Sequence, residues 1–179
     1  MATTHVLMRP EQFDALPERE GLHYELLDGE LIEVPSASAR HNYIAGLLTY
    51  KLNHFLVPNR LAVVLPETEF AVGVNRLRPD IAVMSKAKFE LIGEGRSPVP
   101  ELPEIAVEIA SPSESAPEME RKVAVYLEAG VTEVWVVYPR TRHLFAHTNA
   151  GARLVDREGV LTTDVLPGWS LRVGEIFSN

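Results

Sequence analysis

The feature that most constrains the fold is a buried strand, a helix and a second buried strand in direct succession. Residues 104–110 and 133–138 are apolar at nearly every position, which is typical of strands covered on both faces of a sheet. Between them, residues 118–129 repeat apolar side chains at helical spacing and end at Gly130, a favourable residue for closing a helix. Two strands joined in this way form a right-handed parallel crossover. We therefore expect an α/β fold whose sheet is partly parallel.

Further elements before and after this unit predict a mixed sheet. Asp28-Gly29 between two strand-like runs is a strong hairpin pattern, and apolar residues at helical spacing predict a long amphipathic helix. The predicted elements are a helix at 10–16, hairpin strands at 23–27 and 30–34, a helix from Ser36 or Ser38 to Pro58, strands at 61–65, 69–74 and 80–84, a surface loop or lid at 86–103, and an antiparallel meander at 143–147, 152–155 and 160–166. The expected fold is a central mixed β-sheet flanked by helices, with an N-terminal hairpin and a C-terminal meander, in a single domain over residues 1–179.

Composition limits the environment of the chain. There is no cysteine, which excludes disulfides and thiolate metal sites and makes a reducing cytoplasm the expected location. No apolar run approaches the roughly 20 residues of a membrane helix, and residues 1–13 lack the pattern of a signal peptide. We therefore expect a cytoplasmic protein without a membrane partner.

The net charge of −8 argues against a protein that coats nucleic acid nonspecifically, because such binding relies on many basic contacts to phosphate. It does not exclude a nuclease, whose metal site needs acids. Arg76, Arg78, Lys86 and Lys88 surround Asp80 in the sequence and could form a local basic rim; ordinary solvated surface is the alternative.

Two carboxylates stand at the edges of predicted strands. Asp80 follows Pro79 and opens an apolar run, where a turn or cap role is an equal alternative. In the strand at 104–110, alternation places Glu108 on the face that carries Ala106 and Ala110, whose small side chains leave room for a ligand or metal. The alternative for Glu108 is a core ion pair with one basic residue.

Lys122 and Glu25 extend this group. Lys122 lies at the boundary of the buried face of its helix, so its ammonium could reach the sheet edge, although an ordinary surface pair with Glu118 remains an alternative. Glu25 lies in the first hairpin and could be a further acidic ligand or part of a cross-strand pair.

Two acids and a lysine suit magnesium chemistry. Magnesium prefers oxygen ligands, and one or two carboxylates are enough to hold it against a substrate phosphate. A nearby lysine would orient water or stabilise developing charge. Other site classes lack support, because the chain has no glycine-rich phosphate loop and no Gly-x-Ser-x-Gly elbow, and its six histidines form no paired zinc motif. His41 is expected to have a capping or surface role, with substrate contact as the alternative, and His143 and His147 are expected on one exposed face.

These residues lie in segments that resemble the Uma-two family of restriction-endonuclease-like proteins, within the PD-(D/E)XK nuclease superfamily. The matching segments span nearly the whole chain: residues 24–30 (YELLDGE), 40–42 (RHN), 78–83 (RPDIAV), 107–113 (VEIASPS), Lys122, 126–131 (YLEAGV) and 133–137 (EVWVV). The resemblance implies a restriction-endonuclease-like core.

The resemblance also implies roles for individual residues. Asp80 and Glu108 would be metal ligands, with Ile109 completing the predicted ligand set, and the catalytic lysine would have moved from the strand to the following helix, as Lys122. One departure is that the position two residues after Glu108, where the superfamily usually has its lysine, is Ala110, so activity depends on Lys122 reaching the site. The family's usual aspartate one turn before the helix lysine is here Glu118.

The leading hypothesis is a magnesium-dependent DNA endonuclease with Asp80, Glu108, Lys122 and Glu25 as its catalytic residues, and with manganese as a substitute metal. The alternative is a catalytically inactive nucleic-acid-binding or protein-interaction module on the same fold. A small-molecule hydrolase is disfavoured, because no nucleophile or base emerges. The closing strands, with Trp135 and Trp169, could support a homodimer that cuts both strands of DNA, or these tryptophans belong to the core.

Overall fold

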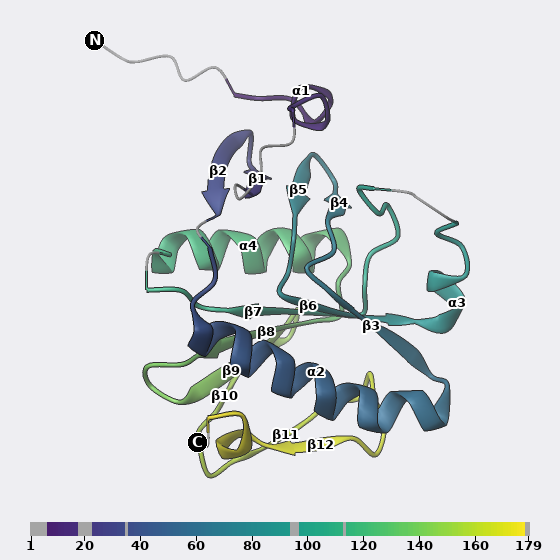
Figure 1. The fold of residues 1–179 in the computed structure, drawn as a ribbon, viewed down its shortest axis with the longest axis vertical. Helices are drawn as coiled ribbons and strands as arrows, with labels where there is room; N and C mark the ends of the chain where they lie inside the picture. The colour runs from purple at the N-terminus through teal and green to yellow at the C-terminus, as the bar shows by residue number, and fades with distance from the viewer. Residues whose placement is uncertain (1–6, 18–22, 35, 94–96, 113, 178–179) are drawn as a thin grey trace.

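The computed structural model describes residues 7–17, 23–34, 36–93, 97–112 and 114–177 (Figure 1). Its helices are α1 (Pro10–Asp14), α2 (Ala39–Asn59), α3 (Lys86–Phe89) and α4 (Ala116–Ala129), with a 3₁₀ turn at Val173–Ile176. Its strands are β1 (His23–Leu27), β2 (Glu30–Val34), β3 (Ala62–Pro66), β4 (Phe70–Val72), β5 (Asn75–Leu77), β6 (Ile81–Ser85), β7 (Ile105–Ile109), β8 (Glu133–Tyr138), β9 (His143–Thr148), β10 (Gly151–Val155), β11 (Val160–Thr162) and β12 (Ser170–Arg172).

The central sheet has six strands in the order β10-β9-β8-β7-β6-β3. Strands β7 and β8 are parallel and joined by α4, whereas the other neighbouring pairs in this sheet are antiparallel. A parallel pair needs a long crossover connection, and α4 supplies it. The structure thus confirms the predicted mixed sheet and the strand-helix-strand unit at its centre.

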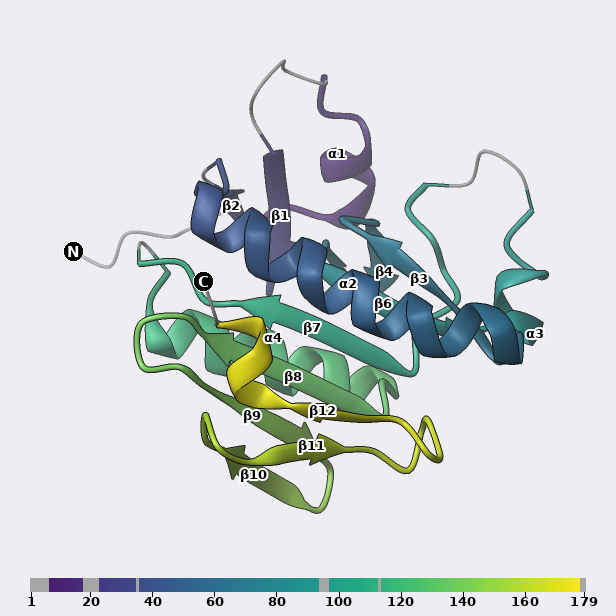
Figure 2. The ribbon, with the colours of Figure 1, turned by 60° about the horizontal axis from the view of Figure 1, so that its bottom comes forward.

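Strand β7 is buried on both faces, as its apolar run predicts. Its odd-numbered residues, such as Val107, belong to the core on the side of α2 and the C-terminal segment. Ala106 belongs to the core on the opposite side, under α4 and the first hairpin. Figure 2 shows these layers, with the sheet between α2 and α4. Because side chains alternate along a strand, Glu108 faces the α4 side.

Helix α2 lies along the sheet as its apolar spacing predicts, burying Ile44, Leu48, Leu52 and Leu56. Ser38 caps it, with its side-chain oxygen accepting a hydrogen bond from the His41 N–H at 3.2 Å. The cap fixes the start of α2, and with it the position of His41, at one end of the central sheet.

Helix α4 begins after Ser115, which accepts a hydrogen bond from the Glu118 N–H at 3.3 Å. It ends at Gly130, whose φ of 105° lies in the left-handed region that favours glycine. Met119, Lys122, Val123 and Tyr126 are its buried residues, so a charged residue occupies the buried face together with apolar ones.

The N-terminal hairpin forms with the predicted strand bounds. Leu27 lies opposite Glu30, and Asp28 and Gly29 form the turn with φ values of 53° and 80°. The hairpin joins β5 and β4 in a second sheet of order β2-β1-β5-β4. This second sheet carries Glu25 over the α4 side of the central sheet.

Two predicted segments differ from the structure. The strand predicted at 69–74 is the shorter β4, which forms a hairpin with the unpredicted β5 because Gly73, with φ of 59°, turns the chain after Val72. The loop predicted at 86–103 contains α3, and its buried Val99 pairs with Phe70 in an isolated bridge. The prolines and glycines of this segment indicated a surface loop, but part of the segment is anchored in the core through Val99.

The predicted C-terminal meander is only half right. Strands β9 and β10 extend the central sheet, but β11 pairs with β12 in a separate two-stranded sheet. This arrangement brings Trp169 onto Trp135, with ring centroids 5.3 Å apart, inside the core. The tryptophans are core residues, and a homodimer stays a prediction that they do not support.

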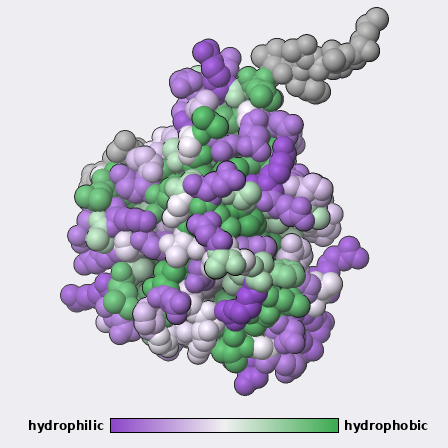
Figure 3. Space-filling model, turned by 180° about the vertical axis from the view of Figure 1, so that it is seen from behind, coloured by the Kyte–Doolittle hydropathy of each residue, from purple (hydrophilic) through white to green (hydrophobic). Residues whose placement is uncertain are grey.

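Much of the surface seen from behind is hydrophilic, with hydrophobic residues in smaller groups between (Figure 3). Within the described part of the chain, no helix has the length and apolar character needed to cross a membrane.

Candidate active site

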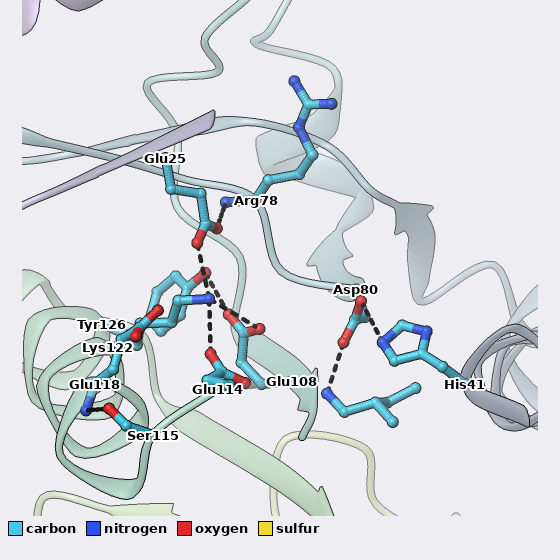
Figure 4. A network of polar contacts seen from close by, with 11 residues as sticks. Glu25, His41, Arg78, Asp80, Glu108, Glu114, Ser115, Glu118, Lys122 and Tyr126 are labelled. Atoms are coloured by element: carbon cyan, nitrogen blue, oxygen red, sulfur yellow. Dashed lines mark hydrogen bonds and ion pairs between the residues drawn. The ribbon is translucent and has the colours of Figure 1, made fainter. Parts of the chain in front are cut away.

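Asp80 and Glu108 come together at the ends of two neighbouring strands. Asp80 directly precedes β6, and Ile81 lies opposite Val107 in the antiparallel pair of β6 with β7. Continuing this register by one residue places Asp80 beside Glu108. Figure 4 shows Glu108 between Asp80 on one side and the Lys122 ammonium on the other. The two carboxylates predicted from separate segments therefore share one site.

Lys122 reaches this site from α4. Its Nζ lies 2.8 Å from Glu25 Oε2, 3.2 Å from Glu114 Oε1 and 3.8 Å from Glu108 Oε2. Desolvation by itself lowers the pKa of Lys122, but the carboxylates of Glu108, Glu25 and Glu114 raise that pKa overall. Lys122 is therefore a buried ammonium held by acids from three separate segments, rather than half of a surface pair with Glu118.

Glu25 is bound on both sides. Besides contacting Lys122, its Oε1 accepts a hydrogen bond from the Arg78 N–H at 2.8 Å. Its opposite residue across the hairpin is Ile32, so no cross-strand ion pair forms at that position. Glu25 thus links the hairpin to α4 and to the segment just before Asp80.

Glu108 has a second partner in Tyr126, whose hydroxyl donates to Glu108 Oε1 at 3.0 Å. Burial raises the pKa of Glu108, and the nearby carboxylates of Glu25, Asp80 and Glu114 raise it further, against the opposing effect of Lys122. Burial likewise raises the pKa of the Tyr126 hydroxyl, which remains a donor. Tyr126 fixes the direction in which the Glu108 carboxylate points.

Asp80 is held by two groups of different origin. Its Oδ2 accepts a hydrogen bond from the Ile109 N–H at 2.6 Å, and its Oδ1 lies 3.1 Å from His41 Nε2. The hydrogen bond to Asp80 raises the pKa of His41, although partial desolvation opposes this. The expected capping or surface role of the His41 side chain is therefore wrong, because this side chain turns into the site.

The ligand set fits a hard divalent cation. The N–H and C=O of one strand residue point the same way, so the Ile109 carbonyl faces the edge occupied by Asp80. Two carboxylates and a carbonyl oxygen suit magnesium, which keeps several waters. In the described part of the chain, no three His, Asp or Glu side chains group closely enough to hold a metal by themselves. Any ion here would therefore depend on water or substrate oxygens as further ligands.

A cleft of about 760 Å³ opens over these residues. Glu25, Asp80, Glu108, Glu114 and Lys122 all line it, together with parts of the hairpin and the start of α2. The carboxylates outnumber the cations here, which favours a bound cation over a bound anion alone.

The predicted basic rim is only partly present. Arg78 lines the cleft, whereas Arg76, Lys86 and Lys88 are absent from its described lining and pair with Asp14, Glu90 and Glu104, respectively. These residues diverge in space because β5 precedes the start of β6, whereas α3 follows its far end at Ser85. Arg40 and Arg140 line the cleft instead.

Sequence reasoning missed Glu114 and the roles of His41 and Tyr126. Tyr126 lies one helical turn after Lys122 on the same stripe, so its approach to Glu108 had a detectable signal. Glu114 lies in a connection between strand and helix, where no periodicity indicates a direction. His143 and His147 share one face as predicted, but they are half-buried beside Phe145 rather than exposed.

Comparison with known proteins identifies related chains. A family model described as "Uma2: Putative restriction endonuclease" matches residues 10–174. A crystal structure described as a "putative nuclease belonging to DUF820 from Anabaena variabilis ATCC 29413" superimposes with a TM-score of 0.82 at 20% identity, covering 95% of this chain and 97% of that chain. No curated protein matches the chain. These findings confirm the resemblance and the predicted fold.

Proposed function

Because the chain belongs to the Uma2 family, we propose that it is a magnesium-dependent endonuclease that hydrolyses phosphodiester bonds of DNA. The observation that carries the proposal is the juxtaposition of Asp80 and Glu108 in a cleft, with the Lys122 ammonium 3.8 Å from Glu108. Manganese is the expected substitute for magnesium, because it too accepts oxygen ligands.

Asp80, Glu108 and the carbonyl of Ile109 are the groups that would hold the ion. A bound divalent cation supplies Lewis acidity and positive charge beside the substrate phosphate. Asp80 and Glu108 meet the requirement for oxygen ligands with one or two carboxylates. His41 is a positioning residue here, because its contact with Asp80 Oδ1 restrains the carboxylate that the Ile109 amide holds from the other side.

Lys122 acts on the substrate as a cation. In phosphodiester hydrolysis, a water oxygen bonds to phosphorus, one P–O ester bond breaks, and negative charge grows on the phosphoryl oxygens. The ammonium, held in place by Glu25 and Glu114, would donate hydrogen bonds to those oxygens. Glu25 therefore positions Lys122, which is a more specific role than the metal ligand considered from the sequence.

The test is conversion of supercoiled plasmid to nicked or linear forms in magnesium, compared with EDTA. We expect Asp80→Asn and Glu108→Gln to lower the rate by about 100-fold or more. Glu120→Gln, an exposed acid on the same helix as Lys122, is the control and should retain the wild-type rate. Undiminished cleavage in both site variants would assign the activity to another site.

A catalytically inactive binding module on the same fold is the second candidate. One observation favours it, namely that Lys122 is already engaged by three carboxylates. Calorimetry with manganese separates the two functions without relying on activity. The endonuclease requires manganese binding that Asp80→Asn abolishes, whereas the inactive module predicts no cleavage with any divalent metal and little heat on adding manganese.

A further inference from the structure

The size of the cleft limits what can reach Asp80 and Glu108. Its volume of about 760 Å³ falls within the range of about 300–1,000 Å³ for pockets that enclose small molecules. The hairpin contributes His23 and Tyr24 to one wall, and the segments after β7 and β8 contribute Pro112 and Arg140. One turn of duplex DNA is roughly 34 Å long, so a cleft of this volume suits a short stretch of separate strand better than an intact duplex.

The cationic groups in the cleft are also few. Apart from Lys122, its described lining contains three arginines, Arg40, Arg78 and Arg140. Arg40 already donates to the Phe177 carbonyl at 3.1 Å, and Arg78 lies 3.4 Å from Glu69. Strong nonspecific binding of duplex DNA uses about 6–10 phosphate contacts, which this cleft does not offer.

The polar groups of the cleft lining are suited to contact with only a few phosphates. Arg78 Nε and His41 Nδ1 are buried nitrogens without a hydrogen-bond partner in the described part of the chain, and both residues line the cleft. A buried polar atom without a partner is costly, so a ligand oxygen at these positions would remove a penalty. Arg78 and His41 each offer one such nitrogen, and Arg140 is a further cation of the lining, so the cleft suits contacts with two or three successive phosphates.

The cleft also offers an aromatic side chain, Tyr24, on which a base can stack. It is half-buried on β1 and lines the cleft beside the exposed His23. Aromatic side chains stack on bases that are free of a duplex, and each such stack contributes about 1–3 kcal/mol to the binding of single strands. Bases inside a duplex are already stacked on one another and cannot use Tyr24 in this way.

We propose that the preferred substrate is a single-stranded segment of DNA a few nucleotides long, in a free strand, a gap or a flap, with its phosphates against Arg78 and His41 and a base on Tyr24. This inference rests on the proposed endonuclease function. It adds a substrate class and assigns the hairpin wall to substrate recognition.

The first experiment measures binding without cleavage. Wild-type protein in calcium, a divalent cation that takes oxygen ligands, is titrated into a labelled 12-nucleotide strand and into the same sequence as a blunt duplex, with fluorescence anisotropy as the readout. A denaturing gel of the titrated DNA checks that it stays uncut. We expect binding of the single strand to be at least about 10-fold tighter. Because two or three contacts are involved, log K should fall with log salt at a slope of about −1.4 to −2.

Two tyrosine variants test whether Tyr24 contributes to binding of the single strand. Tyr24→Ala should weaken binding of the single strand by about 5- to 150-fold. Tyr50→Ala, at an exposed position on α2 outside the described cleft lining, should leave binding unchanged. Thermal denaturation of both variants establishes that they fold, and the comparison of wild-type protein on the two DNAs stands without them.

Cleavage in manganese then separates this inference from the proposed function. Cuts confined to the single-stranded arm of a flap substrate support both. Equal or faster cutting of blunt duplex overturns the single-strand inference and leaves the endonuclease intact. Tighter binding of the single strand without any cleavage supports the preference for single-stranded DNA but refutes the proposed hydrolysis. Equal binding of both DNAs, or binding of neither, overturns the inference.

Discussion

Lys122 should stabilise the fold as well as serve the site, which makes Lys122→Met an informative substitution. Methionine keeps much of the length and the apolar stem of lysine but removes the ammonium. The Lys122 side chain is only 7% exposed and contacts Glu25, Glu108 and Glu114. Its loss leaves these carboxylates without the cation that they share.

The expected loss of unfolding free energy follows from the burial of these groups. Removing one partner of a buried ion pair costs about 3–5 kcal/mol, because the remaining charge is desolvated and unpaired. Burial raises the pKa of Glu108 and of Glu114, so proton uptake by one of them offsets part of this cost. We therefore expect Lys122→Met to lose about 3 kcal/mol of unfolding free energy, the lower end of that range. Such a loss lowers the Tm of a chain of this size by about 6–12 °C.

The assay is thermal and urea denaturation of the variant at neutral pH, beside Lys86→Met as the matched control. Lys86 forms a surface pair with Glu90 at 3.6 Å, and its side chain is 53% exposed. Such a pair contributes about 0.5 kcal/mol or less. If Lys122→Met loses no more stability than Lys86→Met, the ammonium does not hold the acids together as argued.

Three further substitutions test stability. Tyr126→Phe removes the hydrogen bond to buried Glu108 and should cost about 1.5–3 kcal/mol in urea denaturation, and a loss below about 0.5 kcal/mol would contradict the contact. Gly130→Ala should cost about 1–2 kcal/mol, because φ there is 105° although a Cβ would meet no atom within 4 Å. Gly46→Ala also meets no atom within 4 Å but lies inside α2, so it should stabilise by about 0.5–1 kcal/mol; the same sign for both glycines would refute the backbone argument.

Local patterns accounted for the elements around the site. The buried β7 follows from its continuous apolar run, the first hairpin from Asp28-Gly29, and the end of α4 from Gly130. Each of these depends on interactions within a few residues or on burial common to a whole segment. Segments whose structure depends on partners distant in the sequence were predicted less well. Examples are Val99, which pairs with Phe70, and β11, which pairs with β12.

The same distinction applies to the candidate site. Alternation along β7 predicts the face that carries Glu108, and the stripe on α4 predicts that Lys122 can reach the sheet edge. The engagement of His41 with Asp80 could not be read in this way, because it depends on how α2 crosses the sheet. The loss of Arg76, Lys86 and Lys88 from the expected rim has a similar cause, since proximity in sequence does not fix the direction of side chains on successive short elements.

The sequence alone determined a mixed α/β fold in which two carboxylates and a lysine occupy strand ends and a buried helix face, because hydrophobic periodicity fixes which face of each element is covered. Only the tertiary structure decided that Lys122 is shared among Glu25, Glu108 and Glu114, and that Asp80 is held between His41 and the Ile109 amide. Those contacts join residues far apart in the chain, and their strength depends on the burial that arises when hairpin, sheet and helices pack together. Charge and distance in a desolvated cleft are properties of the folded chain.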